Sequence, residues 1–527
     1  MNISKFTLSL AGIFFASTAL AQIEIRQQDD QWFSDAQSRI AELEAVQPNT
    51  GKAKNVILFI ADGNGVGTNY ATRLFVGQQD GGNGEGHVLP QEEFPNLALV
   101  KTYTTNGQTP DSAPTASAMN SGIKSRNGTI NVGDAGGYDN CEGAANAGLT
   151  TFSEMVSDMG KSVGIVSTAR ITHATPAAVY AKTTNRDWED DTQLPENCAQ
   201  KDIAAQLVDA IDAGTVDFVM GGGRRHFLPN GITDEEGDEG RRTDDRNLID
   251  EVQEKGWQYV WNSETAAGIK PGQPVLGLFE SSHMQYEEDR EDEPSLAEMT
   301  SMAIDNLSGN EEGFYLQVEA GRVDHANHDG NLHRAVTDGA AFAEAIEQAI
   351  AKVDLEETLV IVTADHEHAI AFNGYCGIGS PITGLCYNVD DNGSTHSDEP
   401  AQGLDGKPYT VAGYLNGAGS ILKEIVPEDD PNAADAEGDG AQQPEASAES
   451  EAAQQGPAEF SGSRPDLTQD EATDPDYMQQ ALIPMTSETH SGEDVALMAA
   501  GPWSHLFRGV IEQNLIFHVM NKAVTAE

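Results

Sequence analysis

The feature that most constrains the fold is an alternation between short apolar runs and helical patterns. The runs are rich in β-branched residues, end in glycine or acidic residues, and cover 56–60, 162–166, 216–220, 314–318, 359–363 and 495–499. Helix-like periodicity is clearest over 203–213 and 332–353. Continuous apolar runs separated by helices are typical of parallel strands that are buried on both faces. The sequence therefore predicts an α/β fold with a mainly parallel central sheet.

Acidic residues stand at the ends of several of these predicted strands. Asp62, Glu319 and Asp365 each fall at or just after the end of an apolar run. In open α/β sheets, ligands bind beyond the carboxyl ends of the strands. We therefore expect the functional site at this edge of the sheet.

The charge of the chain excludes one large class of function. The 527 residues include 85 Asp and Glu but only 30 Lys and Arg, for a formal net charge of −55. Such a surface repels phosphate backbones, so no nucleic-acid partner is expected. Hydrophobic residues make up 38% of the chain, which argues against disorder for most of it. We hypothesise salt tolerance, because a Debye length of about 3 Å at 1 M salt would relieve the self-repulsion of the acids.

The first 21 residues have the pattern of a secretory signal peptide. Lys5 supplies a positive start, residues 6–16 are largely apolar, and Ala19-Leu20-Ala21 matches a cleavage site. Cleavage after Ala21 would place the mature protein in the periplasm or outside the cell. The alternative, an uncleaved anchor, requires a longer apolar run. No later stretch approaches the roughly 18 apolar residues of a membrane span, so no membrane partner is expected.

Four cysteines fit export to an oxidising compartment. Pairing between neighbours along the chain joins Cys141 to Cys198 and Cys376 to Cys386. On the loop-closure model these bridges would stabilise the fold by roughly 4 and 3 kcal/mol. Metal ligation by the thiols is disfavoured, because no Cys-x-x-Cys spacing occurs.

The pattern divides the mature chain into a core and an insertion. Residues 22–370 and 486–527 carry the strand and helix patterns of the core. From 371 to 485 these give way to glycine, asparagine, serine and acids, which predicts an inserted domain. Within it, 427–460 has ten acids and no Lys or Arg, so a solvated, mobile segment is expected there.

Two motifs place oxygen atoms at the ends of predicted elements. Residues 55–63 form an apolar run that ends in Asp62, whose carboxylate would be desolvated unless a cation neutralised it. Ser112 lies within 109–117, between an acid and small residues suited to a first helical turn. Its hydroxyl can meet a cation and the helix N–H groups there. Taken alone, Asp62 is equally well a helix N-cap, and most serines in the position of Ser112 are helix caps.

Histidines join the carboxylates in a third motif, residues 317–329. Asp324 and His328 are four residues apart, so one helical turn aims both at one point. Glu319 and His325 lie in the same segment. Imidazole and carboxylate ligands suit zinc, whereas carboxylate and hydroxyl oxygens suit magnesium. The alternative interpretation is a solvated cluster of charges.

Three further segments carry single groups of the same kind. Asp365 and His366 follow an apolar run and can share a metal only where the strand has ended. His490 stands before the last predicted strand, where a lone histidine is more often structural. Thr175 offers a hydroxyl to a hard cation, and Arg186 offers a planar fork for two phosphate oxygens.

Taken together, these segments resemble the alkaline phosphatase family in order and spacing over nearly the whole mature chain outside 371–485. The resemblance implies a three-layer α/β/α core with a crown-like inserted domain, hydrolysis of small phosphate monoesters, and a homodimer. It also implies two zinc ions and one magnesium ion. Ser112 would be the nucleophile that forms a phosphoserine, and Arg186 would clamp the phosphate.

The resemblance assigns the metal ligands as well. The first zinc site would consist of Asp324, His328 and His490. The second zinc site would consist of Asp62, Asp365 and His366. The third site, for magnesium, would consist of Asp62, Thr175 and Glu319.

The sequence departs from the best-studied enteric member of the family near the third site. That member has an Asp and a Lys where this chain has His173 and His325, as animal and some marine members do. His173 would then face the third metal and His325 the phosphate, each through water, with weaker retention of magnesium. The segments around Glu280 and Glu293 resemble an additional calcium site of animal members, with Glu293 in place of an Asp.

Other functions fit parts of the pattern. Ser112-Ala-Pro-Thr-Ala116 partly imitates the Ser/Cys-x-Pro-x-Arg signature of the structurally related sulfatases, but Ala116 stands where the arginine should be. The remaining alternatives are a phosphodiesterase of the same fold and a non-catalytic exported protein that binds cations on its acidic surface.

Overall fold

The structure, a computed structural model, describes residues 25–390, 392, 396–425 and 459–526. The predicted signal peptide and most of the predicted mobile segment, 427–458, lie outside the described residues. The chain divides into two compact units, 1–47 and 48–527. The described part of the first contains one helix, α1 (Gln31–Ala45), none of whose residues is buried.

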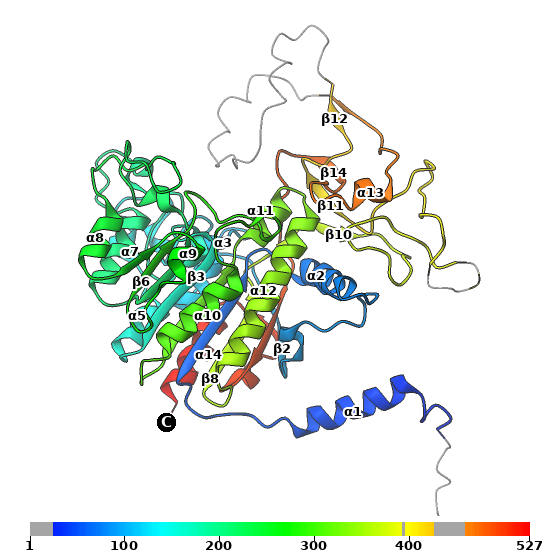
Figure 1. The fold of residues 1–527 in the computed structure, drawn as a ribbon, viewed down its shortest axis with the longest axis horizontal. Helices are drawn as coiled ribbons and strands as arrows, with labels where there is room; N and C mark the ends of the chain where they lie inside the picture. The colour runs from blue at the N-terminus through cyan, green and yellow to red at the C-terminus, as the bar shows by residue number, and fades with distance from the viewer. Residues whose placement is uncertain (1–24, 391, 393–395, 426–458, 527) are drawn as a thin grey trace, which may run out of the picture. The chain divides into compact units, whose positions relative to one another are not determined.

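A ten-stranded sheet forms the centre of the second unit, in the order β17-β2-β16-β8-β1-β7-β3-β4-β6-β5 (Figure 1). Neighbouring strands pair in parallel except at β16, which runs antiparallel to both β8 and β2. The strands are β1 (Asn55–Ala61), β2 (Asn96–Lys101), β3 (Ser162–Arg170), β4 (Phe218–Gly222), β5 (Gln258–Val260), β6 (Val275–Leu278), β7 (Phe314–Ala320), β8 (Thr358–Ala364), β16 (Val495–Ala500) and β17 (Gly509–Glu512).

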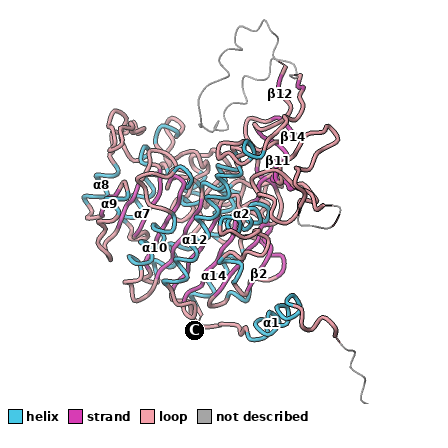
Figure 2. The backbone as a smooth tube through the Cα atoms, turned by 45° about the vertical axis from the view of Figure 1, so that its right-hand side comes forward, coloured by secondary structure: helices cyan, strands magenta, loops and turns pink. Residues whose placement is uncertain are grey.

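Helices cover both faces of the sheet, as alternation along β1 shows. Val56, Leu58 and Ile60 belong to one apolar core, whereas Ile57 and Phe59 belong to another. Successive side chains of a strand point to opposite faces, so two separate cores require a helical layer on each side. The fold is therefore a three-layer α/β/α arrangement, with helix and strand layers visible in Figure 2.

The first core is covered by α3 (Ser112–Ser121), α5 (Phe152–Asp158), α6 (Ala174–Ala177), α7 (Ile203–Asp212), α8 (Leu248–Glu254) and α14 (Leu515–Thr525). The second core is covered mainly by α10 (Leu296–Leu307) and α12 (Leu332–Lys352). The remaining helices of the core and its loops are α2 (Val66–Gln79), α4 (Gly143–Ala147), α9 (Ser263–Ala266) and α11 (Arg322–His328).

The predicted strands and crossover helices are present, with ends shifted by a few residues. The run 216–220 begins its strand two residues late, at Phe218, and the run 162–166 continues to Arg170. Strand β2 escaped prediction because its apolar residues lie on both faces: Ala98 and Val100 are buried, whereas Leu97 and Leu99 are exposed. Strands β5, β6 and β17 are too short for periodicity to identify.

The region predicted as an insertion contains a second, smaller sheet, in the order β10-β11-β14. Its strands are β10 (Ile370–Phe372), β11 (Ala412–Gly417) and β14 (Ala481–Pro484), accompanied by the two-residue strands β12 (Lys423–Glu424) and β13 (Phe460–Ser461) and by α13 (Gln469–Ala472). Ile382 and Val411 of this region pack with Leu74 of α2 and Val336 of α12. The small sheet therefore rests on helices of the core.

Both predicted disulfides are present. Cys141 is bonded to Cys198 and Cys376 to Cys386, closing 57 and 10 residues. Within the described ranges, no helix combines the length and the apolar character needed to cross a bilayer.

A buried carboxyl group lies in the middle of α12. Asp338 is 4% exposed, and one of its oxygens accepts a hydrogen bond from the Glu287 backbone N–H at 3.1 Å. Burial raises the pKa of Asp338 from 3.8 to about 7, although the charge of Arg322 opposes the shift. Ionisation therefore costs free energy in the folded protein that it does not cost in the unfolded chain.

We expect Asp338→Asn to stabilise the protein in a pH-dependent way. Because the folded pKa lies above the unfolded one, the wild type loses stability as pH rises from about 4 to about 7, by up to roughly 4 kcal/mol. The neutral amide avoids that loss, so its advantage should grow over this range and stay constant above it. Urea denaturation of both proteins, stripped of metal identically, measures the difference. The exposed Glu347→Gln change on the same helix should leave the profile unchanged; an equal effect there would contradict the assignment.

Candidate active site

The candidate site lies at the carboxyl ends of three adjacent strands. In the register of the sheet, Ala61 of β1 stands beside Ala320 of β7 and Ala364 of β8. Asp62 and Asp365 directly follow β1 and β8, and α11 with Asp324 begins two residues after β7. The parallel register therefore brings three chain segments that are far apart in sequence to one point.

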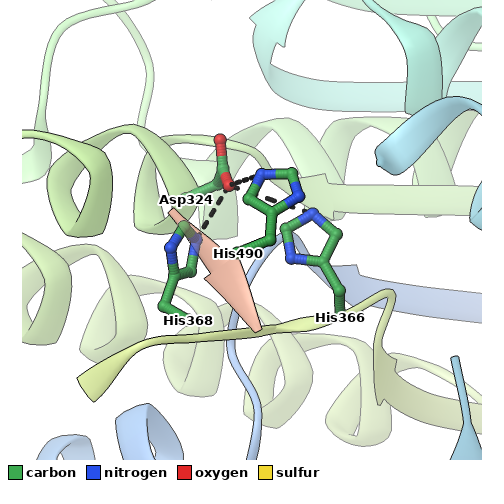
Figure 3. A group of neighbouring side chains, drawn as sticks. All are labelled: Asp324, His366, His368 and His490. Atoms are coloured by element: carbon green, nitrogen blue, oxygen red, sulfur yellow. Dashed lines mark hydrogen bonds and ion pairs between the residues drawn. The ribbon is translucent and has the colours of Figure 1, made fainter. Parts of the chain in front are cut away.

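The first group is centred on Asp324 (Figure 3). Its Oδ1 lies 2.8 Å from Nε2 of His368, 3.3 Å from Nε2 of His490 and 3.4 Å from Nε2 of His328. Asp324 and His328 are presented by successive turns of α11, as their spacing predicts. The structure thus brings together the three residues predicted for the first metal site and adds His368.

The tautomers of two of these histidines follow from their partners. Nδ1 of His328 lies 2.6 Å from the Glu488 carbonyl, and Nδ1 of His490 lies 2.9 Å from the Pro110 carbonyl. A carbonyl only accepts, so each Nδ1 carries the proton and each Nε2 is left with a lone pair. These two Nε2 atoms face each other at 3.0 Å. Two acceptors at that distance, beside a carboxylate, fit a bound cation.

The second group surrounds Ser112. Nε2 of His366 lies 3.2 Å from Oδ1 of Asp62 and 3.4 Å from Oδ2 of Asp365. Nδ1 of His366 points at the Glu367 carbonyl at 3.3 Å, which again directs the Nε2 lone pair into the site. The Ser112 hydroxyl lies 3.4 Å from both Asp62 Oδ1 and His366 Nε2. The three residues predicted for the second metal site therefore lie close to the candidate nucleophile.

Ser112 is the first residue of α3, and Asp111 is its N-cap. Asp111 Oδ1 accepts a hydrogen bond from the Ala113 N–H at 2.8 Å. The unpaired N–H groups and the dipole at a helix start favour negative charge.

The alternative that Asp62 is itself a helix cap is wrong, because the N-cap of the next helix, α2, is Gly65. Asp62 is thus free to turn into the site.

The third group is made of oxygen atoms. Asp62 Oδ2, Thr175 Oγ1 and Glu319 Oε1 are buried and, among the described residues, have no hydrogen-bond partner. The other oxygen of Glu319 accepts a short hydrogen bond from the Ser167 hydroxyl. Leaving three buried polar atoms unpaired is costly, so the set fits a hard cation such as magnesium.

The burial of these acids raises the pKa values of their carboxyl groups. Burial, helped by the charges of Asp324 and Glu319, raises the pKa of Asp62 well above its ordinary value. Burial also raises the pKa values of Asp365 and Glu319 to about 7 each. Carboxylates in such surroundings favour the neutral form unless a cation is bound beside them.

Arg186 links the nucleophile to the third group. Its guanidinium donates to Asp111 Oδ1 at 3.2 Å and to Nε2 of His173 at 2.8 Å. Arginine only donates, so Nε2 of His173 accepts and its proton is on Nδ1. A ring nitrogen of His173, together with a carboxylate oxygen of Asp62 and one of Glu319, forms a compact set whose atoms lie within 4.8 Å of one another. A protonated nitrogen donates to water rather than binding a metal, which favours a water-mediated role for His173.

His325 is arranged in the same manner. Arg322 donates to its Nδ1 at 3.1 Å, which leaves the proton on Nε2. Nε2 is buried and, in the part of the chain that the structure describes, unpaired. The ring of His283 lies 4.0 Å away between centroids. Burial and the charge of Arg322 lower the pKa of His325 well below its ordinary value, so the ring is a neutral donor.

Sequence reasoning assigned no role to His368 or Glu488. Both stand inside motifs that carry other ligands, and Glu488 precedes His490 by two residues. In the structure they bind each other, since His368 Nδ1 lies 2.6 Å from Glu488 Oε2. Burial acts to lower the pKa of His368, but the carboxylates of Glu488 and Asp324 outweigh it and raise that pKa well above its ordinary value.

Glu280 and Glu293 lie near each other but away from these groups. The backbone N–H of Gln285 donates to Glu293 at 2.8 Å, and its side-chain amide donates to Glu280 at 2.9 Å. Burial and the charge of Glu280 raise the pKa of Glu293 to about 8. An additional cation at this pair stays a prediction.

Comparison with known proteins identifies the family. The family model described as alkaline phosphatase matches residues 53–526. The chain belongs to the alkaline phosphatase family. An alkaline phosphatase of Gadus morhua is 37% identical over 488 residues, covering 90% of this chain and 92% of that protein. The tissue-nonspecific isozyme of Felis catus is 36% identical over 536 residues, covering 98% and 92%. As a member of this family, the protein is a phosphoric monoester hydrolase.

Solved alkaline phosphatases share the fold. The structure from Thermus thermophilus has a TM-score of 0.61 at 23% identity and covers 92% of this chain and 94% of its own. The structure from the Antarctic bacterium TAB5 has a TM-score of 0.59 at 21% identity and covers 90% and 99%. At these identities, both structures show that the fold is shared.

We expect Gly63→Ala to disturb the site directly. Gly63 has φ +65°, and a Cβ there would lie 2.3 Å from Nε2 of His368 and 3.2 Å from Cα of Asp324. The methyl group must push His368 off Asp324, so metal retention should fall sharply. Metal content after dialysis measures this.

Gly214→Ala is the matched control for this change. Gly214 has φ +69°, and among the described residues nothing lies within 4 Å of an added Cβ. An alanine at either position costs about 1 kcal/mol because of the positive φ, but only the alanine at position 63 contacts His368. Equal metal loss in the two variants would show that backbone strain, and not the contact with His368, is responsible.

Proposed function

We propose that this enzyme hydrolyses phosphate monoesters through a phosphoserine on Ser112, with two zinc ions and one magnesium ion. The observation that carries the proposal is the position of the Ser112 hydroxyl. It stands at the start of α3, 3.4 Å from Asp62 Oδ1 and from His366 Nε2, where acceptor atoms converge. A phosphatase needs a nucleophile and positive charge at one point, and this arrangement offers a place for both.

The donor sets support the choice of metals. Asp324, His328 and His490 mix imidazole nitrogen with carboxylate oxygen, as do Asp62, Asp365 and His366, and such sets suit zinc. The third site offers only oxygen atoms, from Asp62, Thr175 and Glu319, and suits magnesium. A variant of the TAB5 enzyme is described with Mg bound in its M3 site.

The metals, when bound, would supply Lewis acidity beside Ser112 and the phosphoryl group. The chain supplies the rest. Ser112 Oγ forms a bond to phosphorus as the P–O bond to the alcohol breaks, and the alcohol leaves with a proton. Water then adds to phosphorus, and the P–Oγ bond breaks to release phosphate and restore the serine. The N–H groups at the start of α3 favour the anion throughout.

Arg186 would bind the non-reacting phosphate oxygens. Its two contacts, with Asp111 and His173, hold the guanidinium beside Ser112 without neutralising it by a bidentate pair. A planar fork fits two oxygens of a phosphoryl group. His325, with a free Nε2–H, is suited to donate to a water that contacts the phosphate.

Several broader properties are proposed along with this reaction. Residues 371–485 would form a crown-like domain, the protein would be exported after cleavage at Ala21, and two copies would form a dimer. The disulfides support export, because they form in oxidising compartments. The acidic surface supports adaptation to salt.

We expect Ser112→Ala to reduce kcat for an aryl phosphate by at least about 1,000-fold while zinc content stays at the wild-type level. Loss of a nucleophile typically costs that much or more, whereas the alanine leaves every proposed metal ligand in place. Ser121→Ala is the matched control, since its hydroxyl lies on the same helix and, among the described residues, bonds the Ser117 carbonyl alone. Undiminished hydrolysis by Ser112→Ala would refute the nucleophile assignment and favour a non-catalytic, metal-binding role for the site.

Parallel assays of an aryl phosphate, a phosphate diester and an aryl sulfate should show a strong preference for the monoester. Ala116 lies fully buried in α3 and offers no charge where sulfatases would carry the arginine of their signature. Measurement of kcat/KM for the three substrates ranks the alternatives. Dominant turnover of the sulfate or of the diester would replace the proposal with the corresponding activity.

A further inference from the structure

We propose that Glu488 is a positioning residue that arranges every ligand of the first zinc site, Asp324, His328 and His490. The inference rests on the proposed function only in taking that site to hold zinc. Glu488 is 1% exposed and touches none of the reacting groups. It acts on the three ligands by three different routes.

The backbone of Glu488 fixes His328. Its carbonyl accepts from Nδ1 of His328 at 2.6 Å, and its N–H donates to the His328 carbonyl at 2.9 Å. The first bond sets the tautomer that turns Nε2 of His328 toward the site. The second bond holds the end of α11 against the backbone of Glu488. His328 is therefore fixed both at its ring and at its backbone.

The side chain of Glu488 fixes Asp324 through His368. Oε2 lies 2.6 Å from Nδ1 of His368, and Nε2 of the same ring lies 2.8 Å from Asp324 Oδ1. Oε1 accepts from the Ala369 N–H at 2.6 Å, which fixes the plane of the carboxylate. A chain of bonds from Glu488 through His368 to Asp324 thus orients the carboxylate, in the way that outer partners orient metal ligands generally.

The third route is the chain itself. His490 follows two residues later in β15 (His490–Ser491), which pairs with β9 (Glu367–His368) so that His490 stands opposite His368. Gly417 of β11 closes the other side, since a Cβ there would lie 3.2 Å from Cβ of Glu488. A shift of Glu488 would therefore displace the rings of His368 and His490, which both face Asp324.

A specific prediction separates this role from general stabilisation. Glu488→Gln keeps the backbone bonds to His328 and the packing against Gly417, but it removes the carboxylate that binds His368. Zinc should be lost from the first site alone, with its affinity lowered by about 10- to 100-fold. The second zinc site shares no contact with the Glu488 side chain and should keep its ion.

The experiment measures zinc per protein by atomic emission after dialysis against graded concentrations of a chelator, starting from the zinc-loaded enzyme. We expect two zinc ions in the wild type and one in Glu488→Gln at intermediate chelator, with equal melting temperatures for the two metal-free proteins. Glu493→Gln, an exposed residue of the same segment, removes the same unit of charge and should behave as the wild type. If Glu488→Gln does not fold, Glu488→Asp, which keeps the charge on a shorter side chain, is measured in the same way.

The outcomes are distinct. Loss of one ion of two supports the proposal. Retention of both ions with wild-type chelator dependence, or equal loss of both, overturns it, because the carboxylate would then be dispensable or merely structural. A wild type that holds no zinc after loading would refute the proposed function itself, whatever the variant does.

Discussion

The repulsion among acceptor atoms at one edge of the sheet is the constraint on which the rest of the site depends. Four buried carboxylates, those of Asp62, Glu319, Asp324 and Asp365, meet there with histidine nitrogens that carry lone pairs. Backbone carbonyls fix the tautomers that turn those lone pairs inward. Buried charges of one sign are tolerated only when they are neutralised, so this edge is suited to bind cations. Cations bound there would also attract a phosphate anion to a chain whose net charge is −55.

The sheet supplies the precision that this arrangement needs. The parallel register aligns the ends of β1, β7 and β8, and the segment that follows each strand carries its side chains at this edge, on a helix only after β7. Glycine at position 63 is required at the narrowest point, where its positive φ and missing side chain make room for His368. Rigid strands position the ligands, whereas the small sheet of the 371–485 region contributes Gly417 behind Glu488.

Much of this could be predicted from the sequence, for a physical reason. Buried parallel strands are continuous apolar runs, so their ends, and the acids that follow them, can be located without a structure. Asp324 and His328 could be recognised because residues four apart lie on the same face of a helix. His368 and Glu488 could not be assigned in that way. Their contact joins residues 120 positions apart in the chain and depends on the pairing of the two-residue strands β9 and β15, and periodicity carries no information about such a contact.

Asp62 has a consequence for how the metals bind. One of its oxygens faces His366 and Ser112, and the other belongs to the set of oxygens with Thr175 and Glu319. If both proposed metal positions are filled, the first ion to bind would orient this shared carboxylate, and its charge would be divided between the two ions. Binding at the two positions would then be coupled. A titration with one metal would report constants that belong to the pair, as protons do when two acids share a site.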